Sequence, residues 1–120
     1  MPPGEVHEGL VGKVEQRLRS AGYVHPKKNP VATVRADIVG VKEFSRGRRR
    51  IWLVEVETCE SIHSPHAEDQ LVDLEYFARN QNKWESARVS LCISRSCRRA
   101  ANMVLLELFG AGGLVELLAL

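Results

Sequence analysis

Four carboxylates in this 120-residue chain have the type and spacing to bind a divalent cation. Glu8 falls in a segment with helical periodicity, and Asp37 falls in a segment rich in β-branched residues. Glu55 and Glu57 end a second strand-forming segment. Mg²⁺ takes oxygen ligands in an octahedron and commonly retains several waters and a substrate phosphate. A metal site and acids that are merely solvated at strand ends are both open interpretations; Asp37 argues for the metal site, because aspartate is depleted in strands.

Basic residues form a second group, between the two strand-forming segments. Arginine supplies 12 of the 17 basic side chains, and its planar guanidinium group fits phosphate better than the point charge of lysine does. The concentrated members of this group are Arg46, Arg48, Arg49 and Arg50. Such a run is either a solvated loop or a contact for the backbone of a nucleic acid. The net charge of +2 does not decide between these two interpretations.

Histidines and cysteines give weaker signals. His63 and His66 lie just before or at the start of a predicted helix, where they are either accessory groups, as metal ligands or proton shuttles, or ordinary polar loop residues. Cys59, Cys92 and Cys97 are odd in number and lack the paired spacing of a zinc site. We expect these three thiols to be reduced and partly buried.

Hydrophobic periodicity predicts the elements that must position these groups. An apolar stripe followed by a glycine predicts a helix over 5–21. Strand-forming residues predict strands over 33–41 and 51–56 with a basic hairpin tip between them. The other predicted elements are an extended piece at 23–24, a helix over 65–80 capped by Ser64, a strand over 87–94, a helix over 97–109 and a final strand over 114–120.

This order of elements predicts the fold class. A hairpin followed by a helical crossover gives a mixed sheet with helices on both faces, an α/β (or α+β) sandwich in the order α-β-β-β-α-β-α-(β). The glycine motifs GxGxxG and GxxxxGK[ST] are absent from the sequence. Their absence argues against a dinucleotide-binding Rossmann domain and against a P-loop.

Length and composition bound the organisation of the chain. With 120 residues we expect one domain, residues 1–120, with a core over about 5–109 and a C-terminal segment over 110–120. An apolar fraction of 44% and a charged fraction of 27% exclude a disordered tail, a fibre and a simple coiled coil. No apolar run approaches the ~20 residues of a membrane helix, and the N-terminus lacks the features of a secretory signal. We therefore expect a soluble, cytoplasmic protein that does not bind membranes.

At the acidic residues the sequence resembles the PD-(D/E)XK nuclease superfamily. The matching positions are Asp37 in RADIVGV, Glu55 in IWLVEVET and Glu8 in VHEGLVGKVEQRLRSAGY. The resemblance covers roughly residues 5–95 and is closest, in size and order, to small archaeal Holliday-junction resolvases. It implies a restriction-endonuclease-like mixed sheet of four to five strands and DNA cleavage that depends on Mg²⁺ or Mn²⁺. It also implies Glu8, Asp37 and Glu55 as metal ligands and Gln70 as an accessory residue near the site.

One position departs from the family pattern. The lysine that would orient the attacking water falls at position 57, where this chain has a glutamate. Glu57 cannot donate a hydrogen bond when ionised, but it can act as a general base or as a further metal ligand. The leading hypothesis is a metal-dependent endonuclease with Asp37, Glu55 and Glu57 as catalytic residues. The alternative is a module of the same fold that binds a nucleic acid or a protein without cutting.

The C-terminal part of the sequence predicts self-association. Residues 103–120 carry only two charges, Glu107 and Glu116. A helix that is apolar around most of its circumference is buried on more than one side, and large exposed apolar patches mark interfaces. We expect a homodimer formed through the helix at 97–109 or through the last strand, and the resemblance to dimeric resolvases implies the same.

Overall fold

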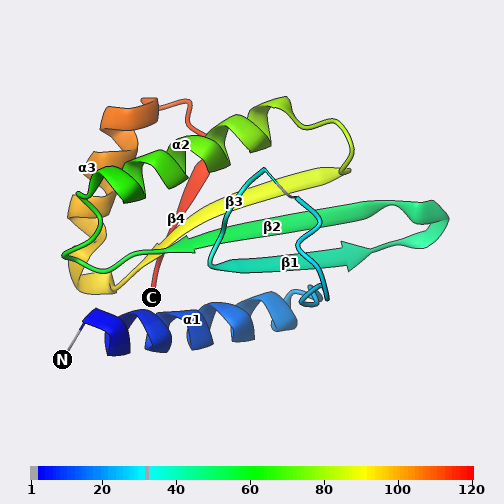
Figure 1. The fold of residues 1–120 in the computed structure, drawn as a ribbon, viewed down its shortest axis with the longest axis horizontal. Coiled ribbons are helices and arrows are strands. Elements are labelled where there is room, and N and C mark those ends of the chain that lie inside the picture. The colour runs from blue at the N-terminus through cyan, green and yellow to red at the C-terminus, as the bar shows by residue number, and fades with distance from the viewer. Residues whose placement is uncertain (1–2, 32) are drawn as a thin grey trace.

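The computed structural model describes residues 3–31 and 33–120, and its ribbon is drawn in Figure 1. The regular elements of the described part are α1 (Pro3–Ser20), β1 (Ile38–Glu43), β2 (Arg49–Val56), α2 (Pro65–Asn80), β3 (Ser86–Ile93), α3 (Arg98–Phe109) and β4 (Val115–Ala119). Short 3-10 turns at Ser45–Gly47 and Arg95–Cys97 join β1 to β2 and β3 to α3.

The four strands form one mixed sheet in the order β1-β2-β3-β4. β1 pairs antiparallel with β2, whereas β2, β3 and β4 run parallel. Parallel neighbours need a crossover connection, which α2 supplies between β2 and β3 and α3 supplies between β3 and β4. α1 covers one face of the sheet, and α2 and α3 cover the other (Figure 1). The predicted α/β (α+β) class and strand number are confirmed.

Alternation along β2 explains why the sheet has two separate apolar cores. Ile51 and Leu53 point to the face covered by α2 and α3, and Trp52 and Val54 point to the face covered by α1. All four side chains are essentially fully buried. Side chains two residues apart share a face of a strand, so the next odd position, Glu55, is directed into the region covered by α2.

The predicted bounds of α2 are confirmed. Ser64 Oγ accepts a hydrogen bond from Ala67 N at 3.1 Å, and Pro65 occupies the first helical turn. A side-chain oxygen at this position satisfies one of the helix's unpaired N–H groups, and proline fits where no N–H partner is needed. This cap fixes where α2 begins and so places its first turns beside the end of β2.

Two predicted strands are shorter in the structure. The strand expected over 33–41 begins only at Ile38, because the Asp37 side chain accepts the hydrogen bond of Val56 N at 2.8 Å and occupies the place of a further backbone partner. The extended piece at 23–24 is a single antiparallel bridge between Val24 and Val41.

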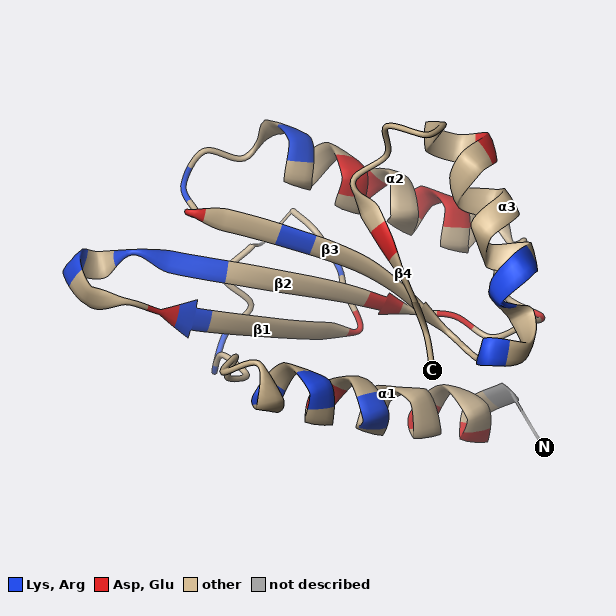
Figure 2. Cartoon of the chain, turned by 180° about the vertical axis from the view of Figure 1, so that it is seen from behind, with Lys and Arg blue, Asp and Glu red and all other residues tan. Residues whose placement is uncertain are grey.

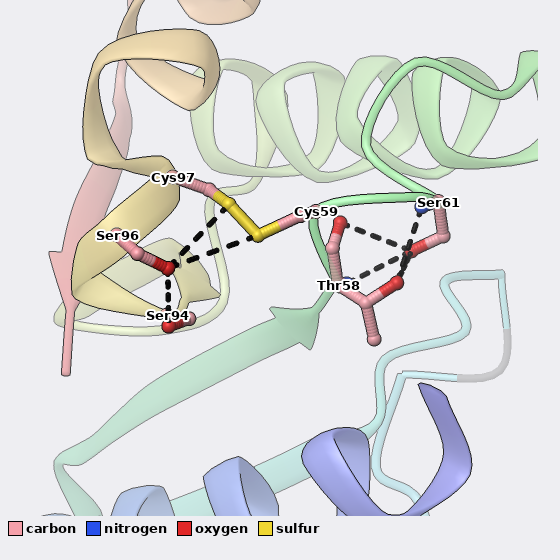
Figure 3. The surroundings of a disulfide bond; sticks show 6 residues. All are labelled: Thr58, Cys59, Ser61, Ser94, Ser96 and Cys97. Carbon is pink, nitrogen blue, oxygen red and sulfur yellow. Dashed lines mark hydrogen bonds between the residues drawn. A yellow bond between two sulfur atoms is a disulfide. The ribbon is translucent and has the colours of Figure 1, made fainter. Parts of the chain in front are cut away.

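A disulfide bond joins Cys59 and Cys97, whose Cα atoms lie 5.7 Å apart (Figure 3). The expectation of reduced thiols is therefore wrong for these two residues, because the fold brings together positions that are 38 residues apart in the sequence. Cys92 is free and buried, and burial raises the pKa of its thiol to about 11. Disulfides persist mainly in oxidising compartments, so the cytoplasmic location stays a prediction.

Within residues 3–31 and 33–120, none of the helices combines the length and the apolar character that crossing a membrane requires.

Candidate active site

A cavity of about 330 Å³ opens at the carboxyl end of β2, between the first turns of α1 and α2. Its lining includes three carboxylates and two histidines: His7, Asp37, Glu55, Glu57 and His66. The structure thus brings together the three acids that the sequence predicts as catalytic. Ligand sites of open α/β sheets lie outside the carboxyl ends of the strands, as this cavity does.

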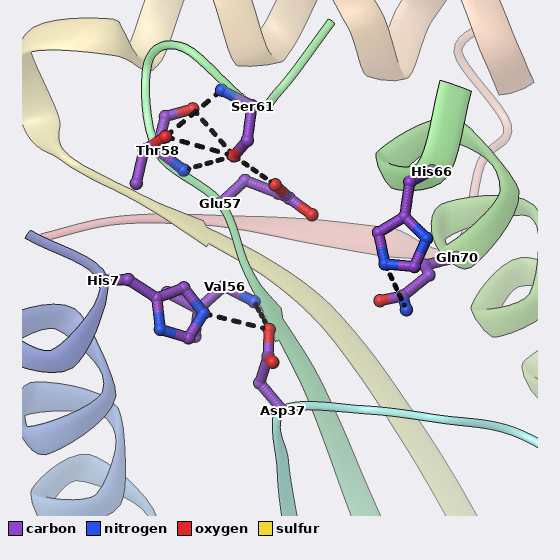
Figure 4. A network of polar contacts seen from close by, with 8 residues as sticks. All are labelled: His7, Asp37, Val56, Glu57, Thr58, Ser61, His66 and Gln70. Atoms are coloured by element: carbon purple, nitrogen blue, oxygen red, sulfur yellow. Dashed lines mark hydrogen bonds and ion pairs between the residues drawn. The ribbon is translucent and has the colours of Figure 1, made fainter. Parts of the chain in front are cut away.

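Asp37 is held at the start of β1 by two contacts. Its Oδ2 accepts the hydrogen bond from Val56 N at 2.8 Å and lies 3.5 Å from Nε2 of His7 (Figure 4). The side chain of Asp37 is 29% exposed, and that of His7 is 36% exposed. The first predicted acid is therefore fixed in orientation and still reachable by solvent and small ions.

Glu55 is the group of the cavity whose pKa is strongly shifted. Its residue is 4% exposed. Burial in the protein, together with the neighbouring carboxylates of Asp37 and Glu57, raises the pKa of Glu55 to about 10. Burial disfavours the charged form of an acid, and like charges nearby disfavour it further. Glu55 is consequently protonated at neutral pH when no cation is present.

Gln70, on the second turn of α2, contacts the Glu55 carboxyl group. When its amide nitrogen faces Glu55 it donates to both carboxyl oxygens, and its oxygen accepts from Nε2 of His66 at 3.0 Å. When its amide oxygen faces Glu55, a protonated Glu55 donates to that oxygen. The amide of Gln70 can therefore pair with Glu55 in either ionisation state, which places this residue where the resemblance implies it.

Glu57 is held by the loop that follows β2. Ser61 Oγ donates a hydrogen bond to Glu57 Oε2 (Figure 4). Glu57 N donates to Cys92 O at 3.0 Å. Ser61 in turn accepts a hydrogen bond from Thr58 N at 2.9 Å. Glu57 itself is 5% exposed. The position where the family pattern has a lysine thus carries an oriented, buried carboxylate.

Gly4 and His7 are the α1 residues that line the cavity, whereas Glu8 is exposed and does not line it. A signal in the sequence could have found His7, because it lies three and seven residues before the buried Leu10 and Val14. Residues at this spacing share one face of a helix. Glu8 is rotated by about 100° from that face.

The two histidines predicted as accessory residues lie in different places. His66 lines the cavity from the first turn of α2 and pairs with Gln70. His63 is exposed and does not line it. Among the described residues that line the cavity there is no lysine and no arginine, so the two histidines are its only cationic groups when protonated.

The side chains that line the cavity are of the chemical type that binds a hard divalent cation. Within residues 3–31 and 33–120, no group of three or more His, Cys, Asp or Glu side chains is already spaced to hold a metal ion. The raised pKa of Glu55, however, results from burial beside two other carboxylates. A cation between Asp37 and Glu55 would relieve this repulsion, and carboxylate oxygens are the ligands that Mg²⁺ prefers.

The four arginines of the predicted basic tip lie at the opposite end of the sheet. Figure 2 shows the basic hairpin and the acidic end of β2 at opposite ends of that strand. The eight residues of β2 span roughly 25 Å at about 3.3 Å per residue. Arg46, Arg48, Arg49 and Arg50 therefore cannot contact a phosphate that sits on the acids.

No protein-family model, curated protein or solved structure matches this chain.

Proposed function

We propose that the chain is a metal-dependent phosphodiesterase that cleaves DNA. The observation that carries this proposal is the convergence of Asp37, Glu55 and Glu57 in one open cavity, with Glu55 buried and its pKa raised to about 10. Strongly perturbed acids in a cleft are characteristic of catalytic and metal-binding sites. The resemblance to the PD-(D/E)XK nucleases supports DNA as the substrate.

In this proposal Asp37 and Glu55 hold Mg²⁺ or Mn²⁺. The bound ion would polarise the phosphoryl group and lower the pKa of the attacking water. Glu57, oriented by Ser61, accepts a proton from that water as general base. His7 positions Asp37 through its contact with Oδ2, and Gln70 positions Glu55.

The second candidate function is a binding module that does not cut. It is favoured by the glutamate at position 57 and by the lack of lysine and arginine among the described residues that line the cavity. Without such a cation, the developing negative charge on the phosphate has fewer stabilising donors. This candidate predicts DNA binding that survives the loss of Asp37 and Glu55.

The experiment that separates the two candidates is a cleavage assay on supercoiled, linear and branched DNA with Mg²⁺ or Mn²⁺. We expect cleavage by the wild-type chain and its loss in Asp37→Asn. The matched control is Glu60→Gln, because Glu60 is an exposed acid in the loop after β2 and does not line the cavity. Absence of cleavage of every substrate, together with unimpaired DNA binding, would reject the nuclease and support the module.

We also propose that the chain forms a homodimer. Met103 and Leu106, on α3, are 54% and 47% exposed. β4, which follows α3, is an edge strand of the sheet. Exposed strand edges and apolar patches favour association. Light scattering should give about twice the 13.4 kDa of one chain; a mass near that of one chain, unchanged on tenfold concentration, would contradict the dimer.

A further inference from the structure

Two adjoining cavities lie between α1, the start of α3 and the end of β4, with volumes of about 880 and 460 Å³. Arg17, Arg95 and Leu120 line both of them, so the two form one continuous depression. We call it the basic groove, after the cationic side chains that line it: Lys13, Arg17, Arg95, Arg98 and Arg99. No aspartate or glutamate is among its described lining residues.

Within the described residues, the cations of the basic groove form no ion pair with an aspartate or a glutamate. Among the described residues the ion pairs of arginine involve Arg48, Arg50, Arg79 and Arg88. None of them involves a residue of the groove. Five cations that share one concavity, with no aspartate or glutamate among its described lining residues, create a positive potential, which attracts an anionic partner.

The start of α3 is electrostatically unfavourable in the protein alone. Arg95 lies in the preceding 3-10 turn, Arg98 and Arg99 lie in the first turn of the helix, and that turn contains no acid. The N-terminal end of a helix carries a partial positive charge, so cations there are repelled and anions are attracted. Departures from such local rules are expected at functional sites.

The basic groove lies near the candidate active site. Cys97 stands between Arg95 and Arg98, and its disulfide partner Cys59 follows Glu57 by two residues (Figure 3). Consecutive Cα atoms are about 3.8 Å apart and the two cysteines are 5.7 Å apart, so the Cα atoms of Arg98 and Glu57 lie at most about 17 Å from each other. This distance corresponds to about five base pairs of a duplex.

We propose that the basic groove binds the phosphodiester backbone of the nucleic acid whose scissile phosphate lies at the acids. This inference rests on the proposed function for its substrate and assigns the phosphate-binding role to Arg95, Arg98 and Arg99. Guanidinium groups bind phosphate oxygens in pairs of hydrogen bonds, and backbone contacts of this kind fix register on the strand without reading sequence. The phosphate contacts that the sequence predicts for the hairpin tip are thereby assigned to the groove.

The test is DNA binding measured in EDTA, so that no cleavage occurs, over 50–200 mM salt. The variant is Arg95→Gln, Arg98→Gln, Arg99→Gln, and its matched control is Arg46→Gln, Arg48→Gln, Arg49→Gln, which removes the same charge at the hairpin. We expect the groove variant to bind at least about tenfold more weakly and to lose about 2 to 3 from the slope of log K against log salt. The control should retain most of its affinity and slope.

Two further readouts keep the outcomes distinct. Because the groove variant removes cations from the start of α3, its melting temperature should equal or exceed that of the wild type, which excludes misfolding as the cause of weaker binding. Equal losses in both variants, or a larger loss in the hairpin variant, would overturn the groove assignment. Cleavage that persists in Asp37→Asn would count against the nuclease and leave the groove assignment intact, whereas the binding measured in EDTA tests the groove alone, so the two proposals fail separately.

Discussion

The two ends of the sheet are both rich in charge, and they differ in how that charge is paired. At the hairpin end, Glu85 lies 3.6 Å from Arg48 and 3.1 Å from Arg50. The Arg49 guanidinium lies 4.4 Å from the centre of the Trp84 ring, and that of Arg50 lies 4.5 Å from the Phe44 ring. The arginines at this end are thus largely occupied by contacts within the chain.

The carboxyl end is arranged in the opposite way. Three acids lie in one cavity without a lysine or arginine among its described lining residues, and the described residues that line the groove beside the arginines at the start of α3 include no aspartate or glutamate. The local energy is unfavourable at both places, because like charges are held together there. The number of charges in a segment therefore says little about function, whereas charges that the fold leaves without a partner indicate what the molecule binds.

The largest effect should follow a change of Glu57, the proposed general base at the carboxyl end. Glu57→Gln keeps the size of the side chain and its contact with Ser61, but it removes the carboxylate proposed to accept the proton. We expect DNA cleavage to slow by about 10²–10⁴-fold, the usual contribution of a general base, in single-turnover assays. Cleavage at the wild-type rate would mean that Glu57 has no catalytic role.

Loss of the disulfide should have the next largest effect, because this bond links the loop after β2 to the start of α3. Its 38-residue separation gives an unfolding free energy contribution of about 4 kcal/mol on the chain-entropy account, with measured values commonly about 2–4 kcal/mol. Cys59→Ser with Cys97→Ser should lower the free energy of unfolding in urea by this amount. The same double variant should no longer respond to a reducing agent; identical stability of both proteins without reductant would contradict the bond.

The pH dependence of the free energy of unfolding should reveal the cost of ionising Glu55 in the folded protein. Because its pKa is raised from 4.5 to about 10, the folded state binds more protons than the unfolded state between these values. The free energy of unfolding of the wild type must then fall as pH rises through this window. Glu55→Gln removes this loss and should be more stable at pH 9 by at least about 1 kcal/mol, or roughly 4 °C in melting temperature. Near pH 4.5 the two proteins should melt alike, and parallel curves up to pH 9 would contradict the assignment.

The smallest effect should come from the hairpin end, where charges are already paired on the surface. Glu85→Gln removes the partner of Arg48 and Arg50, whose side chains are 58% and 41% exposed. Exposed ion pairs contribute about 0–1 kcal/mol, so the free energy of unfolding should fall by less than about 1 kcal/mol, and less in high salt. A loss of DNA cleavage in Glu85→Gln would break the contrast between the two ends.

Local pattern accounts for much of the fold and for part of the site. The bounds of α2 follow from Ser64, Pro65 and an apolar stripe, which are local signals that tertiary contacts did not override. The same holds for the alternation that buries Ile51 and directs Glu55 toward α2. These features depend on neighbours within a few residues in the sequence.

Other features depend on contacts between distant residues, which no local pattern contains. The Cys59–Cys97 bond spans 38 residues, and the partner of Arg50 lies 35 residues away at Glu85. β1 begins only after Asp37, because the Asp37 side chain accepts the hydrogen bond of Val56 N, which lies 19 residues further along the chain. His7 is different, because its helical spacing to Leu10 and Val14, which pack on the sheet, is a local pattern that distinguishes it from Glu8.

The most direct test of the acidic cavity is calorimetric titration of the wild-type chain with Mn²⁺ at pH 7 in buffers of different ionisation enthalpy. Since Glu55 is protonated in the free protein and must ionise to bind a cation, binding should release about one proton per ion and should strengthen as pH rises. Asp37→Asn should bind at least about tenfold more weakly, and Glu60→Gln should bind as the wild type does. Absence of Mn²⁺ binding, or binding without proton release, would contradict the account.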